Sequence, residues 1–369
     1  MSQQIQVLIL QGGGALGAYQ AGVYEQLAQH DFSLDWIIGT SIGAINAALI
    51  AGNQPQHRIS KLKEFWSSLA PQPMQGMQLW EQHLPWMNVS ASMNTMGTLM
   101  QGVDGFFKPR AGLIWDMNAK VPLAQNSFYD TSPLKSTLEK YIDFDYLNDG
   151  PMRISVCAVD LDSGRNRVFD NKKQTILPEH IMASGALPPG FPAIEIEGKM
   201  YWDGGIYSNS PLEVFLEEGE KHDALCFMVD LWDPTEARPT SMAEALARFK
   251  NIQYASRSKD QLAIRRTIRN LQHAIRVLGE HVPAADRKKL QSLVKLGSDH
   301  TINVVHLIMK ALPDDHYFKD IDFSAATVEK RWQMGLADAQ RALQHAAWLQ
   351  PLPEHAGLII HELPQERGA

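Results

Sequence analysis

The sequence predicts an α/β protein in which a central, largely parallel sheet lies between two layers of helices. Two stretches near the N-terminus carry this prediction, because each runs from an apolar strand through a glycine-rich turn into a helix. The first has its strand at residues 5–10 and its expected helix at 18–30. The second has its strand at 36–38 and a helix of small apolar residues at 44–51, with Gly52 as its C-cap. Strands that alternate with helices in this way indicate a parallel sheet.

The rest of the chain continues the alternation, with two hairpins in its middle. The further strands are expected at 153–159, 166–169, 194–196, 199–203, 224–231 and 301–309. The further helices are expected at 59–69, from 133 onward, and at 179–184, 264–278 and 328–348. The tail from 351 to 369 is expected to be loosely ordered.

The composition excludes several classes of protein. The 369 residues are 44% hydrophobic, which suits a sizeable core, and no apolar run approaches the roughly 18 residues that span a bilayer. The N-terminus lacks a basic region before its short apolar run, so we read it as a strand and not a signal peptide. Cys157 and Cys226 lie in strand-like runs and are expected to be free thiols in a reducing compartment, which predicts a cytoplasmic protein. The net charge of −7 argues against a nucleic-acid partner, and no Cys/His cluster has metal-ligand spacing, so no metal site is expected.

Residues 248–295 stand apart because they carry twelve Lys and Arg against three Asp and Glu. Within them one apolar stripe recurs at helical spacing, formed by Ile264, Ile268, Leu271, Ile275 and Leu278. We expect a basic helical hairpin packed on the body or on another subunit of a homo-oligomer. The alternative is a peripheral contact with an anionic membrane surface.

The central motif is Gly39-Thr40-Ser41-Ile42-Gly43, which lies between the second strand and its helix. Strand, Gly-x-Ser-x-Gly and helix form the context of a nucleophile elbow, in which a sharp turn exposes the serine hydroxyl. The helix N-terminus behind Ser41 adds partial positive charge where an oxyanion would form. Without the flanking elements the same pattern could be an ordinary glycine-rich loop.

The run Gly12-Gly13-Gly14-Ala15-Leu16-Gly17 follows the first strand and allows three interpretations. Bare amide groups at a helix N-terminus can form an oxyanion hole that faces Ser41. The spacing also fits a dinucleotide fingerprint, but that site wants an acid at the end of the second strand, and Asp35 precedes the strand. A tight packing turn would explain one or two of the glycines. We favour the oxyanion hole because of the elbow downstream.

The third motif is Asp203-Gly204-Gly205, at the end of an expected strand. A partly buried carboxylate in this place can act as a general base for a serine, although local chemistry alone favours a turn aspartate. A Ser-His-Asp triad would instead recruit a histidine, and the formal candidates are His222, His273, His281, His300 and His306.

Taken together and in this order, the three motifs closely resemble those of the patatin-like phospholipases, particularly the bacterial members. The stretch Ala183 to Pro192 and the turn Asp160 to Gly164 are similar to other segments of that family. The resemblance covers roughly residues 5–231. It implies a three-layer α/β/α patatin-like fold and a Ser–Asp dyad without histidine, with Ser41 as nucleophile and Asp203 as base. It also implies oxyanion donors at Gly12, Gly13 and Gly14.

The remaining glycines of the motifs, Gly17, Gly39, Gly43, Gly204 and Gly205, are expected to support the turns. Leu16 departs from the family pattern, since many relatives carry Arg or Lys there. We divide the chain into an acyl-hydrolase core at 1–235 and a C-terminal region at 236–369 with the basic hairpin, one strand and a final helix. Residues 71–127, rich in Met and aromatic residues, are an insertion in the core and a candidate lid over an acyl pocket.

The expected activity is therefore that of a carboxylic ester hydrolase acting on a lipid or other apolar acyl ester, without metal or organic cofactor. One alternative is an esterase for short or hydroxyacyl esters that uses the same dyad. Another is a dinucleotide-binding or scaffold protein that uses Gly12 to Gly17. A protein of this kind is expected in the cytoplasm, with peripheral membrane contact through 248–295.

Overall fold

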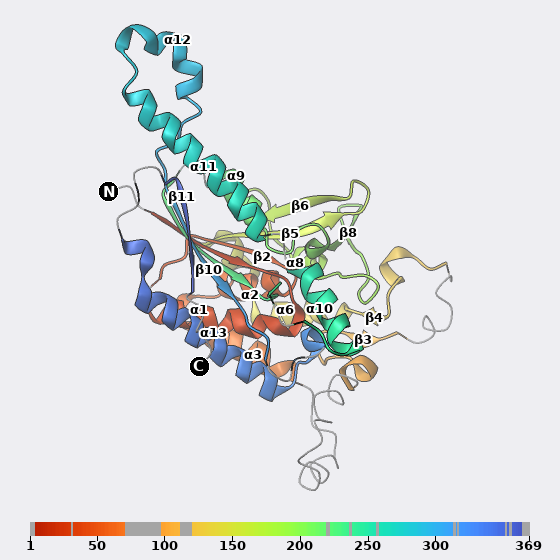
Figure 1. Cartoon of the computed structure of the whole chain (residues 1–369). Helices are drawn as coiled ribbons and strands as arrows, with labels where there is room; N and C mark the ends of the chain where they lie inside the picture. Colours follow the sequence, from red (N-terminus) through yellow and green to blue (C-terminus); the bar gives the residue numbers. More distant parts are fainter. Residues whose placement is uncertain are drawn as a thin grey trace.

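The computed structural model describes residues 4–30, 32–70, 97–110, 120–218, 222–235, 238–255, 258–312, 315, 317–350, 353 and 356–363. Among these residues, nine strands form one central sheet with helices on both faces (Figure 1). The predicted α/β class and the three-layer arrangement are therefore confirmed.

The sheet is parallel over most of its width. Its strands run in the order β11-β10-β9-β1-β2-β5-β8-β7, and β6 also pairs with β5. The six from β11 to β5 are parallel, whereas β6, β8 and β7 form antiparallel pairs beside β5. The bounds are β1 Ile5–Leu10, β2 Trp36–Thr40, β5 Arg153–Asp160, β6 Arg165–Asp170, β7 Ile194–Ile196, β8 Lys199–Asp203, β9 Ala224–Asp230, β10 Ile302–Ile308 and β11 Leu358–Glu362. A small second sheet pairs β3 Lys108–Pro109 with β4 Tyr129–Asp130.

Alternate side chains of the central strands point to opposite faces of the sheet and pack into two separate hydrophobic cores. Leu8 and Leu10 of β1 pack into the larger core with α1, α2, α3, α8 and α13, whereas Val7 and Ile9 pack into the smaller core with α9 and α11. The helices are α1 Ala18–Gln29, α2 Ile42–Ala51, α3 Pro55–Ser68, α6 Ser132–Tyr141, α7 Phe144–Asp149, α8 Pro178–Ser184, α9 Leu212–Glu218, α10 Met242–Tyr254, α11 Ser258–Glu280, α12 Ala284–Val294 and α13 Ala325–His345. The helix expected at 59–69 begins four residues earlier because Pro55 is a favourable first residue.

The C-terminal region holds two strands, so the prediction of a single strand there is wrong. Residues 358–362, which we expected to be loosely ordered, pair with β10 as β11. β10 in turn pairs with β9 and covers an edge that would otherwise expose unpaired backbone groups. The boundary at residue 235 therefore falls within one continuous sheet.

α13 ties the C-terminal region to the first helix of the chain. A Cβ at Gly22 would lie 2.0 Å from the Trp332 carbonyl oxygen, and one at Gly335 would lie 2.0 Å from the Tyr19 carbonyl oxygen. The two backbones can approach this closely only because glycines occupy the crossing. The Tyr19 hydroxyl also donates to Asp338 Oδ2 at 2.7 Å.

The basic helical hairpin exists, but its apolar stripe is not buried on the body. α11 and α12 extend from the sheet as an arm (Figure 1). Ile264, Ile268, Leu271 and Leu278 are 42–67% exposed. The expectation that this stripe packs on the body is wrong for these residues, because the arm runs past the sheet; a contact with another subunit stays a prediction.

Most of the insertion expected at 71–127 lies outside the described residues. Within its described parts, residues 97–101 are helical and Phe106 and Phe107 are buried. The lid stays a prediction.

Candidate active site

The nucleophile turn, residues 39–43, follows β2. Its central residue, Ser41, has φ 56° and ψ −125°, a left-handed backbone conformation that is strained for a side chain. α2 begins at the next residue, Ile42. The predicted order of strand, sharp turn and helix is therefore present, and its geometry is that of a nucleophile elbow.

Close packing of backbone holds this turn. A Cβ at Gly39 would lie 2.3 Å from the Gly43 carbonyl oxygen, and one at Gly43 would lie 2.3 Å from the Leu10 carbonyl oxygen. The Ser41 N–H donates to Ser184 Oγ at 2.9 Å, so it is not free to bind an oxyanion. A side chain at Gly39 or at Gly43 would clash with these carbonyl oxygens, so both positions require glycine.

The register of the sheet brings Asp203 to Ser41. Thr40 of β2 pairs with Cys157 of β5, and the next residue of β5, Ala158, pairs with Asp203 of β8. Gly204 passes so close to β5 that a Cβ would lie 2.4 Å from the Cys157 carbonyl oxygen.

The Asp203 carboxyl is 3% exposed, and the Ser41 hydroxyl is near enough to act on its pKa. Its Oδ1 also accepts the Gly205 N–H at 2.7 Å. Burial raises the pKa of Asp203 to about 7, because it disfavours the charged form; the Gly205 N–H and the Ser41 hydroxyl act in the opposite direction and are weaker. A carboxylate of this kind is a better base for a hydroxyl than an exposed aspartate.

The donor turn, residues 11–14, follows β1, the neighbour of β2. A Cβ at Gly12 would lie 3.0 Å from Ser41 Cβ, so the two turns touch. The Gly12 N–H, which we expected to bind an oxyanion, donates instead to the Asn209 carbonyl oxygen at 3.2 Å. The Gly13 N–H makes no hydrogen bond to another described residue. Gly14 has φ +55°, and a Cβ there would lie 2.2 Å from the Asp320 carbonyl oxygen.

Two side chains hold the Gly12 carbonyl oxygen. Asn209 Nδ2 donates to it at 3.1 Å, and Trp232 Nε1 donates to it at 2.8 Å. Asn209 Nδ2 also donates to the Tyr254 carbonyl oxygen at 3.0 Å, and the Tyr254 ring stacks on Trp232 with centroids 5.2 Å apart. The donor turn is therefore fixed by residues about 200 positions downstream, all of them beyond the three motifs that we identified.

A cavity of about 400 Å³ opens over both turns. Its wall includes Ser41, Asp203, Gly12, Gly13, Gly14 and Gly205. The Gly17, Gly39, Gly43 and Gly204 positions lie outside the wall and shape the turns. An aromatic cluster forms the apolar side, with ring centroids 4.9–6.3 Å apart, and consists of Phe106, Phe107, Tyr129, Phe191 and Phe323.

The alternatives from the sequence find less support in this cavity. No histidine contributes to its wall in the described part of the chain, and His306 is buried elsewhere against Asp230. Asp35, the acid that a dinucleotide site would need, accepts the Gln6 N–H at the start of β1. Among the described residues, no group of three or more potential ligands could hold a metal ion.

Leu16, the departure from the family pattern, is fully buried in the larger core. The single Lys or Arg on the described cavity wall is Lys250 of α10, which forms an ion pair with Asp320. Four residues at this site were not predicted from the sequence: Asn209, Trp232, Tyr254 and Lys250. Only Asn209 had a local signal, its place six residues after Asp203 in a turn before α9.

Family comparison matches residues 8–216 to a family described as patatin-like phospholipase. A second family model, described as patatin phospholipase, matches residues 252–355. No curated protein matches the chain.

Three solved structures are similar. VipD from Legionella pneumophila is 13% identical, with 92% of this chain and 67% of that chain covered and a TM-score of 0.39. The type III effector ExoU is 13% identical, with 94% and 54% covered and a TM-score of 0.37. Full-length ExoU in complex with SpcU, from Pseudomonas aeruginosa, is 18% identical, with 68% and 47% covered and a TM-score of 0.24. This chain thus spans about half of ExoU and two thirds of VipD.

Proposed function

The chain belongs to the patatin-like phospholipase family, a family of lipid-hydrolysing enzymes, and we propose that it is a serine acyl hydrolase with a Ser41–Asp203 dyad. The observation that carries the dyad is that Ser41 and the buried Asp203 line the same cavity, with the Ser41 hydroxyl near enough to lower the pKa of that carboxyl. A serine hydroxyl is a weak nucleophile unless an adjacent base accepts its proton.

The proposed reaction has two halves. Ser41 Oγ attacks the ester carbonyl carbon while Asp203 takes the hydroxyl proton, and the tetrahedral intermediate collapses to an acyl-serine as Asp203 returns the proton to the leaving alcohol. Asp203 then deprotonates a water that attacks the acyl carbonyl carbon, and it returns the proton to Ser41 Oγ as the fatty acid leaves. The raised pKa of Asp203 suits both directions of proton transfer near neutral pH.

The oxyanion would be bound by the donor turn. Because the Gly12 N–H is already used and the Ser41 N–H donates to Ser184, we assign this role to the N–H groups of Gly13 and Gly14. The N-terminus of α2 adds partial positive charge behind Ser41.

The substrate would be an ester with an apolar acyl chain, since the aromatic cluster lines the cavity beside the dyad. The alternative, a short or hydroxyacyl ester, uses the same dyad. A series of p-nitrophenyl esters with increasing chain length separates the two, because a preference for the shortest chains contradicts an extended apolar pocket.

The dyad is tested by labelling the protein with a fluorophosphonate and mapping the adduct by mass spectrometry. We expect the label on Ser41 in the wild type and strongly slowed labelling in Asp203→Asn. An adduct on a different residue, or undiminished labelling in Asp203→Asn, would refute the assignment.

A further inference from the structure

α10 presents an apolar side to solvent. Met242, Leu246, Phe249 and Ile252 recur at spacings of four, three and three residues, and they are 78%, 48%, 65% and 54% exposed. Asn251 lies on the opposite side of the helix and is 2% exposed. A surface helix of a soluble protein normally shows the reverse pattern. We call these four side chains the α10 face.

The α10 face lies at the candidate active site. Three residues of the same helix, Lys250, Gln253 and Tyr254, line the cavity over the dyad. Phe318, another wall residue, is 41% exposed at the surface. The exposed apolar surface of α10 is therefore next to the cavity that would receive the acyl chain.

Charge favours a lipid surface as the occupant of this face. α10 carries a single acid, Glu244, and its side chain accepts hydrogen bonds from Thr240 at the helix start. The same helix carries two cations, Arg248 and Lys250, so cations outnumber acids on it. Apolar side chains beside cations are the pattern of a helix that lies in an anionic lipid interface. A dimer interface needs roughly 20–30 residues a side, and the α10 face offers four.

We propose that the α10 face docks on an anionic lipid surface and so places the cavity mouth against its substrate. The proposal rests on the proposed lipid hydrolase function. It moves the membrane contact predicted for 248–295 from the arm to α10, which overlaps the first residues of that range and lies outside the arm.

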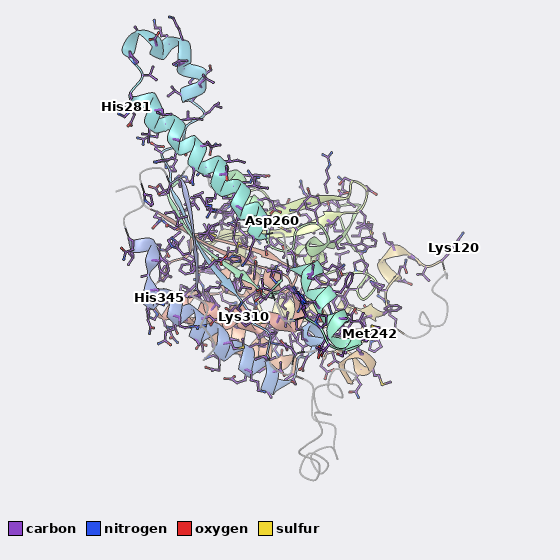
Figure 2. The ribbon with its side chains drawn as sticks, viewed as in Figure 1. Lys120, Met242, Asp260, His281, Lys310 and His345 are labelled. Atoms are coloured by element: carbon purple, nitrogen blue, oxygen red, sulfur yellow. The ribbon has the colours of Figure 1, made fainter. Side chains whose placement is uncertain are left out.

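The arm supplies a matched control. Leu271 and Leu278 of α11 are 59% and 67% exposed, close to the exposure of Leu246 and Phe249, and neither lines the cavity. The two sites lie at opposite sides of the molecule, as Met242 at the start of α10 and His281 after α11 show (Figure 2). The test pair is Leu246→Gln/Phe249→Gln and Leu271→Gln/Leu278→Gln.

The measurement is co-sedimentation with vesicles of phosphatidylcholine, with and without phosphatidylglycerol, in a Ser41→Ala background that keeps the lipid intact. We expect binding to vesicles that contain phosphatidylglycerol, weakened at least ~10-fold by the α10 pair and unchanged by the arm pair. With Ser41 present, turnover of a monomeric short-chain ester should be equal in both pairs, which shows that they fold.

Several outcomes would overturn the docking site. They are no binding by the parent protein, equal binding by the α10 pair, an equal or greater loss in the arm pair, or a parent dimer that the α10 pair converts to monomer. Since binding is measured without turnover, a failed dyad assignment would leave this result readable.

A second inference comes from the hydrogen bonds of the donor turn. Apart from the bond between Pro188 and Pro189, the described peptide bonds are trans, so the C=O of Gly12 and the N–H of Gly13 point in opposite directions. Asn209 and Trp232 hold that carbonyl oxygen at 3.1 and 2.8 Å. We infer that these two are positioning residues, which act on the oxyanion through the Gly12–Gly13 peptide.

Trp232→Phe tests this inference because it removes the N–H donor and keeps most of the ring. Its control is Trp36→Phe. Trp36 Nε1 donates to the buried Ser155 Oγ at 2.9 Å, and neither residue lines the cavity. We expect Trp232→Phe to lower kcat about tenfold with little change in KM or in the pH profile. Trp36→Phe should cost similar thermal stability and leave kcat unchanged. Equal kcat in both variants, or a change in KM alone, would overturn the positioning role.

Discussion

The nucleophile turn after β2 and the donor turn after β1 lie side by side and are held in different ways. Packing of glycine backbone against nearby backbone fixes the nucleophile turn, through Gly39 and Gly43. Hydrogen bonds from Asn209 and Trp232, about 200 residues downstream, fix the donor turn. One turn is thus determined mainly by its own sequence and the other by the rest of the fold.

The largest effect should come from the nucleophile turn itself. Ser41→Ala removes the attacking oxygen, and we expect kcat to fall by at least ~10⁴-fold on a chromogenic ester, by analogy with serine hydrolases that lose their nucleophile. Thermal melting should show an intact fold. Activity within tenfold of the wild type would remove Ser41 from the mechanism.

A methyl group in the donor turn should have the next largest effect. Gly14→Ala must relieve both its φ of +55° and a contact of 2.2 Å with the Asp320 carbonyl oxygen, so the turn must move. We expect a loss of ~10²-fold in kcat, about the effect of one lost oxyanion donor. Gly164→Ala is the control for φ, since Gly164 has φ +63° with nothing within 4 Å of an added Cβ. Similar activities of the two variants would show that close packing at Gly14 is unimportant.

The pH dependence tests the carboxylate that joins the turns. Asp203 must be ionised to accept a proton, and its pKa is about 7. We expect kcat/KM to rise with pH to a plateau above 8, with values at pH 6 about tenfold below it. A profile already flat from pH 5 would mean that the base titrates as an ordinary aspartate.

The smallest expected effect is on stability. Asp203→Asn should make the protein more stable although it lowers activity. The pKa of Asp203 is about 7 in the folded chain and about 3.9 when unfolded, so the folded state binds more protons between these values. Ionised Asp203 therefore costs stability increasingly from about pH 4 to pH 7, and the cost stays constant above that. We expect Asp203→Asn to raise Tm at pH 8 by a few degrees and by less at pH 5, measured by calorimetry. A lower Tm at pH 8 would contradict the raised pKa.

The local signals in the sequence predicted the elbow, the strands around it and the two buried cysteines, because each depends on residues close in the chain. The register that brings Asp203 to Ser41 followed only from the family resemblance, since hydrogen bonding across β5 leaves no trace in either motif. The hold on Gly12 by Trp232 could not be predicted, because a tryptophan after an apolar strand is usually a core residue. β11 was not predicted either, because its pairing with β10 joins residues far apart in the sequence.

The residues that hold the donor turn are synthesised after Ser41. Ser41 leaves the ribosome long before Asn209, Trp232 and Tyr254 exist, so a nascent or truncated chain that stops short of them has a nucleophile without an arranged oxyanion site. We expect such fragments to be inert toward the lipids around them. A cell would then be spared a hydrolase that works before it is finished.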